Sequence, residues 1–124
     1  MTTLTGLSVL LVEDEYLIAL DAEQILKDLG VEEVEVIASW DAAEKRAKDG
    51  QFDLAVLDVN INGKFSFPIA NIIRDRGIPF VFASGYELRN RSPSDLGGAV
   101  CVTKPYTSDR LKDALTAVLT KGTP

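Results

Sequence analysis

Short, mainly apolar runs alternate along the chain with longer stretches in which apolar and polar residues follow helical spacing. A short, continuous apolar run is typical of a strand that is buried on both faces of a parallel sheet. The runs predict strands at residues 7–12, 34–38, 53–57, 79–83 and 99–102.

The stretches between these runs predict amphipathic helices. From residue 15 to residue 29 apolar residues recur every three or four positions, and Gly30 follows where a helix C-cap belongs. Ser39 is a suitable N-cap for a short helix through Lys48. Two later stretches carry the apolar stripes of further helices: Ile69, Ile72 and Ile73 before Gly77, and Leu111, Leu115, Val118 and Leu119 near the end.

Five strands that alternate with helices predict an α/β protein with a doubly wound, five-stranded parallel sheet and helices on both faces. The strand order that suits five strands is 2-1-3-4-5, the flavodoxin-like arrangement. With 124 residues the chain fits a single domain, residues 1–124. In such sheets ligands bind at the carboxyl ends of the strands, where the order reverses between strands one and three.

Composition narrows the classes of function. The net charge is −6 and the 13 Lys and Arg residues are scattered, so no basic face indicates a nucleic acid partner. No apolar run approaches the roughly 20 residues of a membrane span, and no secretory signal opens the chain. The single Cys101 cannot form an internal disulfide, and we expect a cytoplasmic protein. Histidine is absent, which leaves carboxylates as the main available chemistry.

Carboxylates follow two strands that should be neighbours in the sheet. Glu13 and Asp14 come after the first strand and Asp58 after the third, so the three should converge at the switch point. Carboxylates that lie close together repel one another unless a cation or a proton lies between them. Oxygen ligands without His or Cys favour a hard cation, Mg²⁺ before Ca²⁺ or Zn²⁺.

Ser84 ends the fourth strand and Lys104 follows the fifth, which adds a hydroxyl and a positive charge to the same edge of the sheet. Taken singly, each polar residue has an ordinary explanation as a turn former, a helix cap or a surface side chain. The combination at four strand ends indicates phosphoryl transfer. Asp58 would be the nucleophile, with Mg²⁺, Lys104 and Ser84 each stabilising one phosphoryl oxygen.

Glu13-Asp14, Asp58, Ser84 and Lys104-Pro105 resemble the signature of two-component receiver domains, over the whole chain. The resemblance implies a stand-alone response regulator that accepts a phosphoryl group on Asp58 and passes the signal on by conformational change. The donor would be a histidine kinase or a histidine phosphotransfer protein, and the downstream target a further protein. Such a chain is a signalling module that catalyses its own phosphorylation, and not an enzyme in the usual sense.

The resemblance also assigns ligands. Glu13 and Asp14 would hold Mg²⁺, with Asp14 and Asp58 as direct carboxylate ligands and the backbone carbonyl of Asn60 as a further one. A cis peptide bond before Pro105 is also implied. Residues 79–86, PFVFASGY, are similar to the PFxFATGY motif of a subfamily of single-domain regulators, with Ser84 in place of Thr. Kinases of the HWE type tend to be the partners of that subfamily.

The chain departs from the usual receiver pattern at two places. Cys101 occupies the position where many receivers have a Tyr or Phe that swings inward on activation, and Ile61-Asn62 replaces the usual Met-Pro after the acceptor. Another element should therefore change between states. We expect residues 86–98, which contain Pro93 and two glycines, to become ordered on phosphorylation. The alternative is that this stretch is a connector without a regulatory role.

Three other functions are compatible with parts of the pattern. A haloacid-dehalogenase-type phosphatase also uses an aspartyl nucleophile with Mg²⁺, but it requires an Asp two residues later, where this chain has Asn60. A flavin binder of the same fold needs a loop that accepts phosphate after the first strand, and the acidic run Glu13-Asp14-Glu15 would repel phosphate. An interaction module with a vestigial site is disfavoured, because every site residue is present.

Overall fold

The computed structural model of the chain describes residues 4–84 and 100–121. In chain order the elements are β1 (Ser8–Val12), α1 (Tyr16–Asp28), β2 (Glu33–Ile37), α2 (Trp40–Asp49), β3 (Leu54–Asp58), β4 (Asn60–Ile61), β5 (Lys64–Phe65), α3 (Phe67–Asp75), β6 (Phe80–Ser84), β7 (Cys101–Thr103) and α4 (Ser108–Lys121). The stretch 86–98, for which we predicted a change of order, lies outside the described residues, and so does any helix within it.

The five longer strands form one parallel sheet in the order β2-β1-β3-β6-β7. Counted without the short strands β4 and β5, this is the predicted order 2-1-3-4-5, so the predicted fold class is confirmed. Val12 at the end of β1 pairs with Leu57 in β3, and Asp58 pairs with Ala83 in β6. The carboxyl ends of the three central strands therefore lie side by side.

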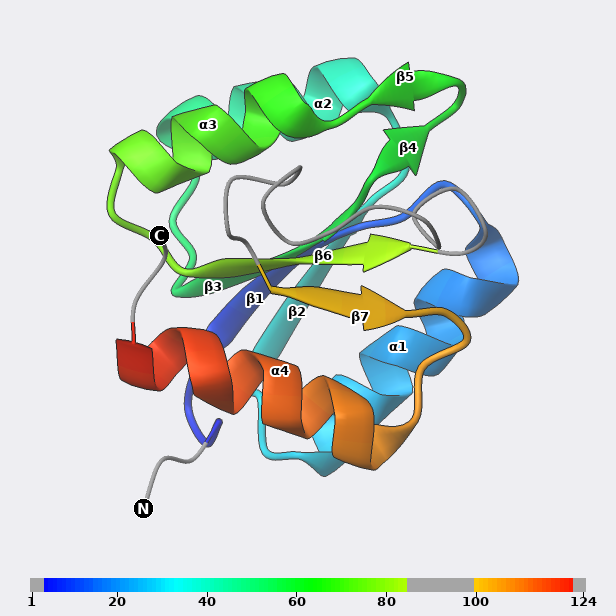
Figure 1. Ribbon diagram of the computed structural model, residues 1–124, viewed down its shortest axis with the longest axis vertical. Coiled ribbons are helices and arrows are strands. Elements are labelled where there is room, and N and C mark those ends of the chain that lie inside the picture. Colours follow the sequence, from blue (N-terminus) through cyan, green and yellow to red (C-terminus); the bar gives the residue numbers. More distant parts are fainter. Residues whose placement is uncertain (1–3, 85–99, 122–124) are drawn as a thin grey trace.

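Helices cover both faces of the sheet, with α2 and α3 on one side and α1 and α4 on the other (Figure 1). Successive side chains of a strand point to opposite faces, so each buried strand supplies both layers. Leu10 of β1 belongs to the cluster under α2 and α3, whereas its neighbour Leu11 belongs to the cluster under α1 and α4. Each fully buried Leu or Phe contributes roughly 1.5–3 kcal/mol, and these two layers supply most of the stability.

The predicted helix boundaries are confirmed where capping chemistry specified them. The Ser39 hydroxyl accepts a hydrogen bond from the Ala42 N–H at 3.2 Å and starts α2. Gly30, just after α1, has a φ of +100°, a backbone conformation that residues other than glycine rarely adopt. The last strand ends at Thr103 instead of residue 102, because Thr103 still pairs with Ser84.

A two-stranded hairpin, β4–β5, follows β3 directly. Its turn is formed by Asn62 and Gly63, and both residues have positive φ, +53° and +87°. Two central residues of positive φ are typical of the type I′ turn, which matches the twist of antiparallel strands. The flanking strands have two residues each and were not predicted, because so short a segment has no recognisable alternation.

The peptide bond between Lys104 and Pro105 is cis, as the resemblance implied. No helix in the described part of the chain is both long enough and apolar enough to cross a membrane.

Candidate functional site

Three carboxylates meet at the carboxyl end of the sheet, as predicted. Glu13 and Asp14 follow β1 and Asp58 ends β3, and one oxygen of each lies within 4.8 Å of the others. Glu13 is 1% exposed and Asp58 2% exposed, whereas Asp14 is only partly buried. The site thus has a dry inner part and an outer side that solvent can reach.

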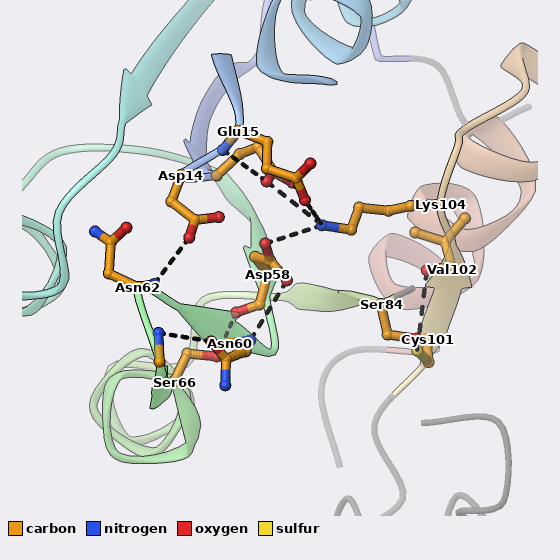
Figure 2. A network of polar contacts seen from close by, with 12 residues as sticks. Asp14, Glu15, Asp58, Asn60, Asn62, Ser66, Ser84, Cys101, Val102 and Lys104 are labelled. Atoms are coloured by element: carbon orange, nitrogen blue, oxygen red, sulfur yellow. Dashed lines mark hydrogen bonds and ion pairs between the residues drawn. The ribbon is translucent and has the colours of Figure 1, made fainter. Parts of the chain in front are cut away.

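Lys104 enters this group from the loop after β7. Its Nζ lies 3.0 Å from Oδ2 of Asp58 and 3.2 Å from Oε2 of Glu13. Glu15 contributes a more distant oxygen at 3.6 Å, from a side chain that is 63% exposed (Figure 2). The Lys104 side chain is 8% exposed, so its charge acts in a poorly screened environment. One buried ammonium therefore faces two buried carboxylates.

Burial dominates the acidity of the group. The pKa of Glu13 is raised to about 7, first by loss of hydration and then by the negative charge of Asp58, while the hydrogen bond from the Glu15 N–H and the charge of Lys104 oppose the rise. Burial also raises the pKa of Asp58, although the hydrogen bond and the charge of Lys104 oppose this. For Lys104 itself burial lowers the pKa, but its contacts with Asp58 and Glu13 outweigh burial and raise it overall. The charge of Lys104 therefore opposes the effect of burial on both acids.

The donor set fits a hard divalent cation. All three converging side chains offer carboxylate oxygens, and Asp14 and Asp58 are within reach of a shared ion. The three carboxylates converge beside the single ammonium of Lys104, with an oxygen of Glu15 also near it, so acidic groups outnumber the basic one here. Mg²⁺ prefers a few carboxylates and retains several waters, which the partly exposed side at Asp14 permits.

The β4–β5 hairpin holds the acids from the other side (Figure 2). The buried Ser66 hydroxyl donates to the backbone carbonyl of Asp58 at 2.6 Å. The N–H of Asn60 points at Oδ1 of Asp58 over a longer 3.4 Å, and the N–H of Asn62 donates to Oδ2 of Asp14 at 2.8 Å. The sequence did not reveal these roles of Ser66 and Asn62. An Asn-Gly pair is typical of a hairpin turn, but it does not specify what the hairpin contacts.

Ser84 lies at the same end of the sheet, and in the unmodified protein its hydroxyl contacts the adjacent strand. Its Oγ is 3.5 Å from Sγ of Cys101 in the adjacent strand, and its backbone carbonyl accepts from the Lys104 N–H at 2.7 Å. Within the described ranges the Ser84 hydroxyl forms no hydrogen bond to the three acids. The structure thus brings together Glu13, Asp14, Asp58 and Lys104 and places Ser84 beside them.

Comparison with known proteins is consistent with this geometry. The family model for the response regulator receiver domain matches residues 9–116. The solution structure of SdrG from Sphingomonas melonis Fr1 is 37% identical, with a TM-score of 0.76, and the match covers 96% of this chain and 99% of that one. A response regulator receiver protein from Sinorhizobium medicae WSM419 is 27% identical, with a TM-score of 0.80, over 95% of this chain and 98% of that one.

A more distant structure with the same fold was crystallised with a metal. It is the receiver domain of the sensor histidine kinase PA1611 from Pseudomonas aeruginosa PAO1, which has a magnesium ion coordinated in its active-site cleft. That domain is 21% identical, with a TM-score of 0.72, over 91% of this chain and 97% of that one. No curated protein sequence matches this chain.

Proposed function

The chain belongs to the family of response regulator receiver domains, and we propose that it is a stand-alone receiver that is phosphorylated on Asp58. The observation that carries this proposal is the position of Asp58. Its carboxylate is buried at the end of a central strand, 3.0 Å from an ammonium group and within 4.8 Å of two further acids. Buried carboxylates next to a cation and a metal site are suited to nucleophilic attack on phosphorus.

In the reaction, a carboxylate oxygen of Asp58 attacks the phosphorus of a phosphohistidine on a partner. A new P–O bond forms as the P–N bond breaks, and the electron pair leaves with the imidazole. The product is an acyl phosphate on Asp58. Since this chain has no histidine, the donor must be another molecule, either a histidine kinase or a histidine phosphotransfer protein.

Glu13, Asp14 and Asp58, together with the backbone carbonyl of Asn60, would hold Mg²⁺. When bound, the ion would neutralise the acids and attract one phosphoryl oxygen. The carboxylate donor set of this chain and the magnesium in the PA1611 receiver domain support this assignment.

Lys104 and Ser84 complete the site. Lys104 already holds Oδ2 of Asp58, and its ammonium would move to a phosphoryl oxygen once Asp58 is modified. Among the described residues, the Ser84 hydroxyl has a weak contact with Cys101 to give up, and rotation about its side chain would direct it at another phosphoryl oxygen. Both groups would then bind the phosphorylated state more strongly than the unmodified one, which is the requirement for a switch.

We infer that the kinase partner is of the HWE type, on the strength of the PFVFASGY sequence at residues 79–86, and that the protein acts in the cytoplasm on a further protein. The match to SdrG covers 99% of that chain, which supports the proposal that residues 1–124 form one receiver domain. Phosphotransfer from a panel of kinases of the same organism tests the partner, and transfer only from kinases of other types contradicts it.

Incubation with acetyl phosphate and Mg²⁺ tests the phosphoacceptor. We expect a mass gain of about 80 Da, one phosphoryl group, in the wild type and none in Asp58→Asn. Asp53→Asn is the matched control, because Asp53 lies just before the same strand, outside the acid group, and accepts a hydrogen bond from the backbone N–H of Ser8. A gain that persists in Asp58→Asn, or that is lost in Asp53→Asn alone, contradicts the assignment.

A second test uses a phosphoryl mimic. SdrG has been determined in a BeF3-activated conformation, and that chain is 38% identical in the comparison. We expect beryllofluoride with Mg²⁺ to raise the melting temperature of this protein by binding at Asp58, and to leave Asp58→Asn unchanged.

A further inference from the structure

Asn62, at the tip of the β4–β5 hairpin, connects three parts of the site. Its backbone N–H donates to Oδ2 of Asp14 at 2.8 Å, across 48 positions of sequence. Its side-chain amide donates to the backbone carbonyl of Ala38, which follows β2, at 3.2 Å. One residue thus ties the hairpin to the ends of two strands.

The turn fixes the direction of the Asn62 N–H. Asn62 has a φ of +53°, in the left-handed region that Asn tolerates better than most residues. Gly63 follows with a φ of +87°, and its N–H donates to the side-chain oxygen of Asn60 at 2.8 Å, which closes the turn. The donor that reaches Asp14 is therefore part of a rigid loop and not of a mobile side chain.

The hairpin is also held at its second strand, β5. The indole N–H of Trp40 in α2 donates to the carbonyl of Phe65 at 2.9 Å, and the ammonium of Lys64 lies 3.5 Å from the centroid of the same indole ring. Phe65 stacks on Phe67 with ring centroids 5.4 Å apart. These contacts reduce the freedom of the hairpin and so of the N–H at its tip.

Asp14 is the acid for which such support matters most. Glu13 and Asp58 are buried and contact Lys104, whereas Asp14 is partly exposed and could rotate into solvent. Figure 2 shows its carboxylate between Asn62 and Asp58, with one oxygen bonded to the Asn62 N–H. That bond leaves the second oxygen available on the side of the acid pocket.

We propose that Asn62 is a positioning residue for the metal: its N–H holds the Asp14 carboxylate in the orientation that binds Mg²⁺. The inference rests on the proposed function, which assigns the ion to this pocket. A proline at this position would have no N–H to donate. Groups that orient a metal ligand typically change metal affinity by about 10–100-fold when they are removed.

The test is a titration with MgCl₂ alone in which the melting temperature is measured at each step. The dependence of the melting temperature on the Mg²⁺ concentration gives the dissociation constant. Asn62→Gly and Asn62→Pro both remove the side chain and its bond to Ala38. Glycine keeps the N–H and the positive φ, whereas proline loses both. We expect Asn62→Gly to bind Mg²⁺ within about threefold of the wild type and Asn62→Pro to bind it about tenfold more weakly.

If Asn62→Pro does not fold, Asn62→Val replaces it, since a β-branched residue disfavours positive φ and turns the N–H away. A lower melting temperature of a variant in chelator is not evidence for the proposal, because only the change of melting temperature with Mg²⁺ concentration measures metal binding. The proposal is overturned if the proline or valine variant titrates within twofold of the wild type. If the wild type itself does not respond to Mg²⁺, the metal assignment in the proposed function fails instead.

Discussion

The ammonium group of Lys104 lies 3.0 Å from a carboxylate oxygen of Asp58, a residue 46 positions earlier in the chain. The contact joins the edge strand β7 to the central strand β3 across the end of β6. It also makes Lys104 the partner on which two buried acids depend, since Glu13 shares the same ammonium at 3.2 Å.

Replacement of Lys104 should therefore be costly in the unmodified, metal-free protein. Removal of one partner of a buried ion pair typically costs about 3–5 kcal/mol, and protonation of an acid will recover part of this, so we expect Lys104→Met to lose roughly 2–4 kcal/mol of unfolding free energy at pH 8. Urea unfolding in chelator measures it. Lys27→Met is the control, because Lys27 is exposed and its partner Glu23 only partly buried, so the pair should contribute less than about 1 kcal/mol. Equal losses in the two variants would show that the buried pairing has no special role.

Lys104→Met should still be phosphorylated, because the nucleophile and the metal ligands remain. Its conformational response should weaken, because the ammonium that would bind a phosphoryl oxygen in the modified state is absent. We expect the rise in melting temperature with beryllofluoride and Mg²⁺ to shrink by half or more, and a full response would contradict the role of Lys104.

The stability of the metal-free protein should fall as the pH rises from about 4.5 to about 7. In this window folded Glu13, with its pKa raised to about 7, binds more protons than unfolded Glu13 with its ordinary value of 4.5. The free energy of unfolding therefore decreases with pH, and the raised pKa of Asp58 acts in the same direction. Unfolding in chelator across this range should show the decline.

Glu13→Gln isolates this effect, because all other titrating groups are shared with the wild type. The slope of stability against pH should be flatter in the variant. Millimolar Mg²⁺ should flatten the wild-type slope as well, since the ion binds the ionised acids. Identical slopes for the wild type and Glu13→Gln in chelator would show that Glu13 does not carry an elevated pKa.

The strand order and the meeting of the three acids could be predicted from the sequence, because both follow from the positions of the strands and from the rules of parallel sheets. Apolar runs located the strands, and the rule for the switch point then brought Glu13, Asp14 and Asp58 together. The sequence analysis did not predict the different burial of the adjacent residues Glu13 and Asp14, because it depends on which long-range partner each one meets: Lys104 for Glu13 and the hairpin for Asp14. The contact of Ser84 with Cys101 was missed for a similar reason: it depends on a side-chain rotamer across two strands.

Ser66 is a residue whose importance only the structure reveals. Its buried hydroxyl donates to the carbonyl of Asp58 at 2.6 Å and so fixes the backbone of the phosphoacceptor. We expect Ser66→Ala to lose roughly 1–2 kcal/mol of stability and to slow phosphorylation by acetyl phosphate several-fold. Ser39→Ala is the control: it removes the α2 cap, costs about 1 kcal/mol, and should leave the rate unchanged. A similar rate effect in both variants would indicate a general loss of stability.

Ser84 should matter only after phosphorylation. In the unmodified protein its hydroxyl lies 3.5 Å from Sγ of Cys101, a weak contact, so Ser84→Ala should change the unfolding free energy by less than about 1 kcal/mol. Once a phosphoryl group is on Asp58, the hydroxyl gains a charged acceptor, and its loss should weaken the response of the melting temperature to beryllofluoride and Mg²⁺. Ser84→Thr is the matched control, because threonine retains the hydroxyl and should retain the response. If alanine and threonine variants respond alike, the hydroxyl does not contact the phosphoryl group.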